Sequence, residues 1–176
     1  KEYKINVFGV TNNHESVSVE ISGFTPYFYI KVPEKLQDKW SDYATKEVKN
    51  YLLKKLYKNS DGLIKVIKVK KKSIDGFTNE KLFTFLKIVT KNEETWKKCK
   101  YILRPSNKNQ KVYINSITNN NLDFEIFEGN IEPFIRFCHQ KEIKLSGWIK
   151  IDNYEIPDED ITRCQINIKT KWANVE

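Results

Sequence analysis

The sequence predicts an α+β fold, and three observations lead to this prediction. Segments in which apolar and polar residues alternate recur along the chain, and this period is typical of half-buried strands. Between them lie amphipathic segments with the 3.6-residue period of helices. Aromatic residues make up 13% of the 176 residues, which is more than a disordered chain carries. We therefore expect a folded core built from both strands and helices.

The N-terminal residues predict a β-hairpin. Residues 3–10 alternate as a strand, TNNHE supplies a turn, and residues 16–21 alternate again. In the second strand, one face carries Val17, Val19 and Ile21. The segment SGFTP then ends the hairpin.

A third strand follows at YFYIKV, residues 27–32. Side chains alternate between the two faces of a strand, so Phe28, Ile30 and Val32 share one face. We expect this face to meet the helices. Tyr29 then lies on the opposite face.

Three helices and several strands are predicted after residue 32. Each helix is assigned an N-cap: Thr45 for residues 45–58, Asn92 for residues 93–103 and Asn130 for residues 131–142. The strands are expected at 62–72, 81–90, 112–117, 122–128, 148–151 and 164–170.

The order of elements predicts the topology of the central part of the chain. From residue 26 to 128 the order is strand, helix, strand, strand, helix, strand. This βαββαβ order is the split βαβ arrangement of ferredoxin-like and RNA-recognition domains. Such a sheet has helices on one face and leaves the other face free, so that face is a candidate binding surface.

Aromatic residues on that free face predict a nucleic-acid-binding site. RNA-recognition domains carry stacking aromatics on their third strand, and here that strand is KLFTFLKI, residues 81–88. Leu82 and Thr84 replace the glycines of the usual pattern. With the lysines of the neighbouring strand as phosphate contacts, the candidate residues are Tyr29, Phe83, Phe85, Lys87, Lys68 and Lys70. The alternatives are that the aromatics pack against protein and that the lysines are simply solvated.

The overall charge fits a polyanionic partner. Lys and Arg number 31 against 23 Asp and Glu, giving a net charge of +8. The excess is nearly all lysine, and asparagine is also abundant. A lysine-rich surface without any nucleic-acid partner is therefore an equally good interpretation of charge alone.

Catalytic and metal-binding patterns are absent from the sequence. Asp123 and Glu125 form a D-x-E pair, but no third carboxylate with a motif context follows, so we predict no catalytic residue and no metal site.

Cys99, Cys138 and Cys164 form no CxxC pair, and we expect buried thiols in a reducing compartment. There is no apolar run of about 18 residues, so no membrane span is expected. The chain lacks Met, and we infer that it is a piece of a longer protein.

Several motifs follow one another in a fixed order along the chain: FGVT (8–11), SVSVEISGFTPYFYIKVP (16–33), FLKI (85–88), FEGNIEPFIRF (127–137), GWIKI (147–151) and TRCQINI (162–168). Together they resemble the N-terminal region of family B DNA polymerases of the delta and large-DNA-virus type. The resemblance covers nearly the whole chain. The chain departs from the family at Gly129, where the family usually has Ser, and in an Asn-rich lengthening of residues 106–122.

The resemblance implies a fold and a role for residues 1–176. Residues 1–25 and 129–176 would form an OB-like strand set beside the βαββαβ unit of residues 26–128. The chain would be a non-catalytic domain without a cofactor of its own. It would brace the exonuclease domain and lie near the single-stranded DNA template.

The resemblance also implies a function for the longer protein. It would be a replicative DNA-directed DNA polymerase with a 3′–5′ proofreading exonuclease, and its catalytic carboxylates, which bind Mg²⁺, would follow this chain. Its location would be intracellular, in a viral replication compartment of the host cytoplasm or nucleus. Two alternatives stay open: a stand-alone module that binds single-stranded nucleic acid, and a protein-interaction scaffold of a replication complex.

Overall fold

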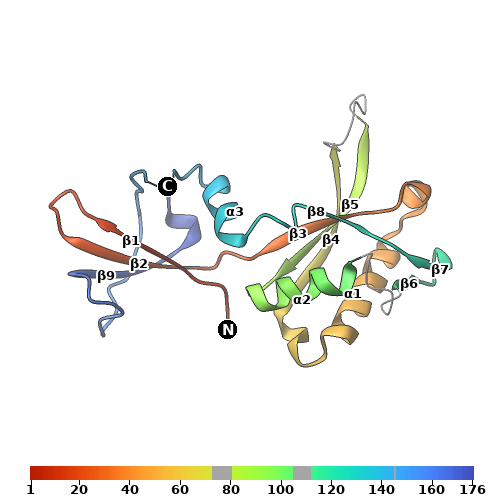
Figure 1. The fold of residues 1–176 in the computed structure, drawn as a ribbon, viewed down its shortest axis with the longest axis horizontal. Helices are drawn as coiled ribbons and strands as arrows, with labels where there is room; N and C mark the ends of the chain where they lie inside the picture. The colour runs from red at the N-terminus through yellow and green to blue at the C-terminus, as the bar shows by residue number, and fades with distance from the viewer. Residues whose placement is uncertain (73–80, 105–111, 145) are drawn as a thin grey trace. The chain divides into compact units, whose positions relative to one another are not determined.

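The structure is a computed structural model that describes residues 1–72, 81–104, 112–144 and 146–176. The chain divides into two compact units (Figure 1). Unit 1 comprises Lys1–Thr25 and Ile131–Glu176, and unit 2 comprises Pro26–Asn130. The mixture of helices and strands confirms the predicted α+β class.

Unit 2 contains a four-stranded sheet in the order β4-β5-β3-β8, in which every neighbouring pair is antiparallel. Its strands are β3 (Tyr27–Lys31), β4 (Leu63–Lys72), β5 (Leu82–Thr90) and β8 (Glu125–Phe127). Its helices are α1 (Asp42–Leu56) and α2 (Glu93–Leu103), with the 3-10 turns η1 (Glu34–Lys39) and η2 (Tyr57–Gly62). A separate two-stranded sheet pairs β6 (Val112–Ile114) with β7 (Thr118–Leu122).

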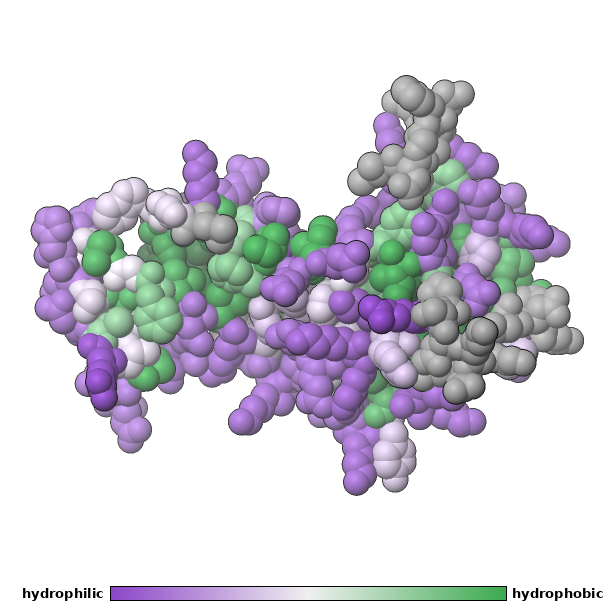
Figure 2. Space-filling view, viewed as in Figure 1, coloured by the Kyte–Doolittle hydropathy of each residue, from purple (hydrophilic) through white to green (hydrophobic). Residues whose placement is uncertain are grey.

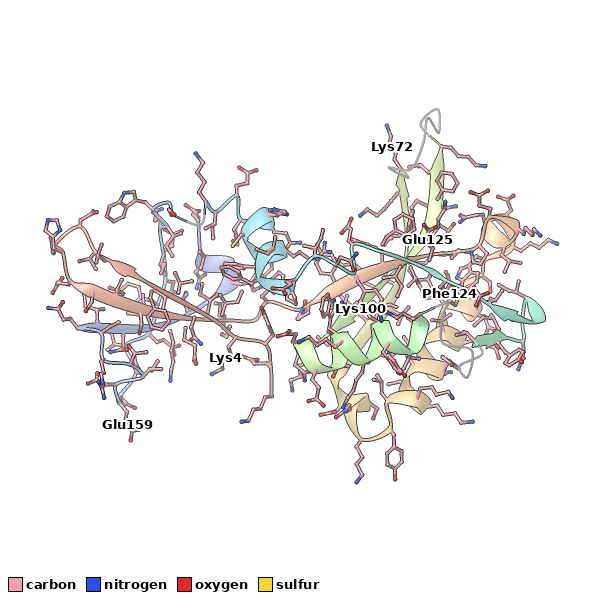
Figure 3. All side chains as sticks on the ribbon, viewed as in Figure 1. Lys4, Lys72, Lys100, Phe124, Glu125 and Glu159 are labelled. Carbon is pink, nitrogen blue, oxygen red and sulfur yellow. The ribbon has the colours of Figure 1, made fainter. Side chains whose placement is uncertain are left out.

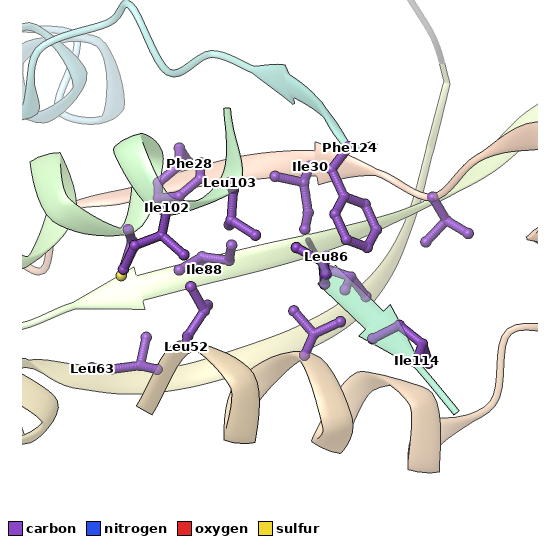
Figure 4. Close-up of a cluster of buried hydrophobic side chains, with 14 of the residues drawn as sticks. Phe28, Ile30, Leu52, Leu63, Leu86, Ile88, Ile102, Leu103, Ile114 and Phe124 are labelled. Carbon is purple, nitrogen blue, oxygen red and sulfur yellow. The ribbon is translucent and has the colours of Figure 1, made fainter. Parts of the chain in front are cut away.

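The main core lies between this sheet and its two helices. Phe28, Ile30 and Val32 are fully buried there with Leu86 and Ile88 of β5. In Figure 4 the strand side chains are directed toward those of the helices, as Ile30, Leu86 and Ile88 show. The helix side chains of this core include Leu52 and Ile102. The prediction that one face of strand 27–32 meets the helices is therefore confirmed. Burial of each such side chain contributes about 1.5–3 kcal/mol to folding.

The first helix begins earlier than the sequence suggested. Ser41, not Thr45, is the N-cap of α1, and its hydroxyl accepts a hydrogen bond from the Ala44 N–H at 3.1 Å. Thr45 is buried one turn later, where its Oγ1 accepts a hydrogen bond from Trp40 Nε1 at 3.0 Å. The predicted cap was wrong because Ser and Thr are both good caps, and only the burial of Trp40 decides between them.

The second helix has the predicted cap and the third does not. Asn92 Oδ1 accepts from the Thr95 N–H at 2.8 Å, so the N-cap of α2 is confirmed. The third helix, α3 (Pro133–Gln140), instead has Glu132 at its N-cap position, with no side-chain cap. Pro133 begins that helix because a first-turn proline needs no hydrogen-bond partner for its nitrogen.

Unit 1 contains a three-stranded sheet in the order β1-β2-β9. The hairpin of β1 (Ile5–Val10) and β2 (Ser16–Ser22) is antiparallel, and β2 pairs in parallel with β9 (Ile166–Lys171), which the turn η3 (Trp172–Asn174) follows. Val19 and Ile21 are buried in its core with Phe137 of α3.

In the C-terminal half, one predicted strand is absent and one observed strand was not predicted. Residues 148–151 form no strand, and only Ile151 pairs with Val175 as an isolated bridge. The asparagine-rich β7 was not predicted as a strand, because Asn is depleted in strands and only its pairing with β6 decides the conformation. Within the Asn-rich region 106–122, residues 106–111 lie outside the described part of the chain.

Candidate nucleic-acid interface

The face of the unit 2 sheet opposite the helices carries a continuous layer of aromatic rings. We call it the aromatic layer, and it consists of Tyr27, Tyr29, Phe83, Phe85 and Phe127. Strand register produces it, because Tyr29 lies opposite Phe127 on β8 and cross-strand partners project to the same face. The predicted residues Tyr29, Phe83 and Phe85 are therefore brought together.

Four rings of the aromatic layer are buried, and Phe127 is partly buried. The exposed fraction is 9% for Tyr29, 5% for Phe83 and 3% for Phe85. Phe85 packs edge-on against Phe127 with ring centroids 5.2 Å apart, and Tyr27 packs edge-on against Tyr29 at 5.6 Å. Edge-to-face contacts of this kind stabilise a packed layer, so these rings function as a small second core.

Lysine ammonium groups lie over the ring faces of this layer. Lys87 Nζ lies 3.7 Å from the Tyr27 centroid, and Lys71 Nζ lies 3.8 Å from the Tyr29 centroid. Two further lysines face the Phe83 ring: Lys31 at 4.5 Å and Lys81 at 5.4 Å. We call these four residues the lysine cover. Cation–π attraction holds each ammonium near a ring while the lysine stem shields the ring from water.

Two of the predicted site residues lie on the other face of the sheet. The β4–β5 register pairs Lys68 with Leu86 and Lys70 with Thr84, which belong to the helix side. Lys68 Nζ forms an ion pair with Asp42 at the start of α1, at 2.6 Å. The structure therefore does not bring Lys68 and Lys70 together with Tyr29, Phe83, Phe85 and Lys87.

Lys31 and Lys71 were not among the predicted site residues, although both lie on this face. Lys31 alternates in phase with Tyr29, and Lys71 alternates in phase with Val69, whose register partner is Phe85. Alternation along β4 puts Lys65 and Lys71 on one face and Lys68 and Lys70 on the other, but it does not say which face carries the aromatic residues. The register of β4 against β5, which shifts at a bulge between Leu63 and Lys65, decides this.

Charge is distributed unevenly across the sheet. The edge strand β4 carries five lysines and no carboxylate: Lys65, Lys68, Lys70, Lys71 and Lys72. The opposite edge strand β8 begins with Glu125 and is followed by Glu128 (Figure 3 labels Lys72 at the end of β4 and Glu125 on β8). Glu128 accepts an ion-pair hydrogen bond from Lys71 at 3.2 Å. The basic character is therefore concentrated on the β4 side.

Burial and a neighbouring positive charge act in opposite directions on the pKa of Tyr29. Burial raises the pKa of the Tyr29 phenol above its usual range, and the Lys71 ammonium group beside it partly offsets that rise. Tyr29 is therefore a neutral phenol at physiological pH.

Unit 1 has a separate feature, an apolar cavity of about 620 Å³. Its lining comes from the hairpin, α3 and the segment after it, including Val7, Phe8, Val10, Phe134 and Trp148. Phe8 and Trp148 are 64% and 74% exposed. Hydrophobic side chains gather over this part of unit 1 in Figure 2. Exposed apolar side chains gathered around a cavity make this part of unit 1 a candidate interaction site.

Neither unit presents a metal-binding cluster among its described residues. No group of three or more His, Cys, Asp or Glu side chains there could hold a metal ion. Asp123 and Glu125 are both exposed on either side of the buried Phe124. Cys99 and Cys138 are buried, whereas Cys164 is half-exposed, so the expectation of burial was wrong for that thiol.

No helix in the described ranges is both long and apolar enough to cross a membrane.

Comparison with known proteins identifies similar sequences along the whole chain. The family model for the exonuclease domain of family B DNA polymerases matches residues 124–176. The chain is 35% identical to a DNA polymerase of Pyramimonas orientalis virus over 99% of its own length, and 29% identical to one of Acanthamoeba polyphaga mimivirus over 100%. It is 29% identical to the DNA polymerase delta catalytic subunit of Candida albicans over 96%.

These relatives are much longer than this chain. The chain spans 14%, 10% and 14% of the length of those three proteins, respectively. Among solved structures, the family B DNA polymerase from the archaeon Pyrobaculum calidifontis resembles it with a TM-score of 0.61 and 20% identity. That match covers 98% of this chain and 18% of the archaeal one, and it shows a shared fold. The chain therefore belongs to the family B DNA polymerases and corresponds to an N-terminal region of a polymerase of the viral and delta type.

Proposed function

We propose that this chain is the non-catalytic N-terminal domain of a replicative DNA-directed DNA polymerase with 3′–5′ proofreading exonuclease activity. The observation that carries this proposal is the similarity to viral and delta-type polymerases over nearly all of the chain. Mg²⁺ would be bound by catalytic carboxylates elsewhere in the parent enzyme. The enzyme would act inside the cell, at the site of viral replication.

We assign the two units to the fold types that the sequence suggested. The βαββαβ order and the β4-β5-β3-β8 strand order of unit 2 support a ferredoxin-like or RNA-recognition-like domain. The β1-β2-β9 sheet of unit 1 is the proposed OB-like part. The Phe28 side of the unit 2 sheet is taken by its helices, so only the side with the aromatic layer is available for other partners.

The domain has two proposed roles in the polymerase. It contacts the single-stranded template weakly through the face that carries Tyr29, Phe83, Phe85 and Lys87, which the net charge of +8 and the lysine cover support. It braces the exonuclease domain through the rim of the unit 1 cavity, which the exposed side chains of Phe8 and Trp148 support.

Primer extension with the full-length gene product tests the polymerase assignment. We expect Mg²⁺-dependent extension of a primed template and removal of a mismatched 3′ nucleotide. The 176-residue chain by itself should do neither. A full-length product that copies no template would contradict the proposal.

The two alternative functions give different results in the same experiment. A stand-alone nucleic-acid-binding module would be encoded by a gene without a D-x-E strand after residue 176 and would bind DNA without copying it. A protein-interaction scaffold would bind neither DNA nor nucleotides. It would be recovered in a complex with other replication proteins instead.

A further inference from the structure

The aromatic layer cannot serve as a stacking platform for bases in its observed form. Stacking needs an open ring face, and the exposed fractions of Tyr29, Phe83 and Phe85 are below 10%. Lysine ammonium groups already lie over these faces, at 3.8 Å for Lys71 on Tyr29 and 4.5 Å for Lys31 on Phe83. A base would have to displace both the lysine and its stem to reach a ring.

The same arrangement places positive charge where a phosphate can reach it. A buried ring below each lysine limits the positions of its ammonium group, so the charge is held at the surface of the sheet. Lys71 of β4 and Lys87 of β5 lie on adjacent strands over neighbouring rings. Lys65 adds a third ammonium group on the same face of β4, since its register partner is Val89.

Carboxylates define the limits of this basic surface. Glu128 pairs with Lys71, Glu34 pairs with Lys31 at 3.5 Å, and Glu125 lies opposite Lys31 in the register. Glu34 and Glu125 belong to the β3 and β8 side of the sheet, where they would repel a phosphate chain. Lys71 would exchange its ion pair with Glu128 for a phosphate. On this face, lysines are the only charged residues of β4 and β5, so a polyanion is favoured there.

We propose that the face of β4 and β5 binds the phosphate backbone of single-stranded nucleic acid through Lys65, Lys71 and Lys87, and that it does not read or stack the bases. This inference rests on the proposed function, because it states how the proposed template contact is made. The aromatic layer supports the lysines from below and stays buried in the complex. Binding is therefore independent of base sequence and strongly dependent on salt.

The lysines of β4 have a second structural role. Lysine on an edge strand prevents another strand from pairing with it, and β4 is an edge strand. If the lysines served only to protect the edge, those on the two faces of β4 would be equivalent for DNA binding. Phosphate binding instead requires the face that has Lys87 beside it, so the two sets of lysines should differ.

Binding of a thymidine homopolymer across a salt series tests the proposal. The face variant is Lys71→Gln with Lys87→Gln, and the matched control is Lys68→Gln with Lys70→Gln, which removes the same charge from the opposite face of β4. Each phosphate contact on a single strand contributes about 0.7 to the slope of log affinity against log salt. The face variant should lose about 1.4 from that slope, and the control should keep it. Restoring charge with Lys71→Arg and Lys87→Arg should restore the slope.

An abasic homopolymer of the same length tests the absence of stacking. We expect it to bind as tightly as the thymidine homopolymer, whereas loss of stacking would weaken binding about tenfold or more for each stacked base. Weaker abasic binding, or equal slopes for the face variant and its control, would overturn the inference and leave the polymerase assignment standing. Absence of all binding would overturn both this inference and the template contact. Failure of primer extension would count only against the polymerase assignment.

Discussion

Gly129 follows β8 at a position where there is no room for a side chain. A Cβ atom at residue 129 would lie 2.5 Å from Ile126 Cγ2 and 3.3 Å from Lys100 Cδ. Lys100 is itself held there, because its Nζ donates to the Gly129 carbonyl at 2.6 Å and lies 3.4 Å from the Trp96 ring centroid. A serine at this position would therefore clash in this chain.

Gly129→Ser is expected to lower the free energy of unfolding by about 1–3 kcal/mol, the usual cost of overpacking. Gly9→Ala is the control, because a Cβ there meets nothing within 4 Å. Urea denaturation of both variants measures the difference. Equal midpoints for Gly129→Ser and the wild type would show that Ile126 can move aside without cost.

Cys99 gives the folded chain a pH dependence in the alkaline range. Burial raises the pKa of the Cys99 thiol to about 12, whereas an exposed thiol titrates near about 8.5. Between these values the unfolded chain releases the proton and the folded chain keeps it. The contribution of the Cys99 thiol to stability is complete below the pKa of the exposed thiol. It is lost as the pH rises toward about 12, the pKa of the buried thiol.

Cys99→Ala should therefore flatten the alkaline part of the stability profile. The variant is less stable at neutral pH because it leaves a cavity in the core. Its stability should fall less steeply above about pH 9 than that of the wild type, by up to about 1.4 kcal/mol per pH unit. Urea denaturation at several pH values provides the measurement, with Cys164→Ala as the half-exposed control. Parallel profiles for wild type and Cys99→Ala would contradict the prediction.

At the scale of elements, the helix N-termini differ in whether a side chain caps them. Asn92 caps α2 through its side chain, whereas Asn130 is exposed and α3 has no side-chain cap. Asn92→Ala should cost about 0.5–2 kcal/mol of stability. Asn130→Ala should cost much less, since surface changes stay within about 0.5 kcal/mol. Thermal unfolding of the two variants compares them directly, and equal losses would show that Asn92 is not an effective cap.

Elements with a strong local pattern were predicted well. Strand β5 and helix α2 have the expected bounds within a residue, because KLFTFLKI alternates and Asn92 caps a segment with an apolar stripe. Elements without a strong local pattern were missed. Strand β7 is mostly asparagine and is defined by its pairing with the neighbouring strand β6, and η1 lies on the path between β3 and α1.

At the scale of the whole molecule, the exposed apolar rim of unit 1 predicts different behaviour for the isolated chain and for the parent enzyme. Phe8→Ser with Trp148→Ser removes two side chains that are mostly exposed. In the isolated chain the stability should change by no more than about 0.5 kcal/mol per site. In the full-length polymerase the melting temperature of the exonuclease region should fall, because the rim would lose its apolar contact.

Tyr43→Ser provides the control for that experiment. Tyr43 is 64% exposed on α1 of unit 2, and Tyr and Ser have similar helix propensities. This change should leave the full-length polymerase as stable as the wild type. If the rim variant and Tyr43→Ser behave alike in the full-length enzyme, the rim does not brace the exonuclease domain.

The candidate site could be predicted only in part. Alternation in FTPYFYIKVP and KLFTFLKI placed Tyr29, Phe83 and Phe85 on one face, and the structure agrees. The same alternation could not assign the lysines of β4, because the bulge before Lys65 sets which of them share that face. A one-residue change of register moves a side chain to the other face of a sheet, so the pattern by itself gave two equivalent choices.

The sequence alone determined the α+β class, the alternating faces of β3 and β5 and the resemblance to family B DNA polymerases, because these depend on local periodicity and on motifs in order. The tertiary structure decided what the aromatic residues do. It buried their rings beneath Lys31, Lys71, Lys81 and Lys87 and placed Lys68 and Lys70 on the helix side. The physical reason is that burial and strand register are properties of residues far apart in the chain, and no local pattern contains them.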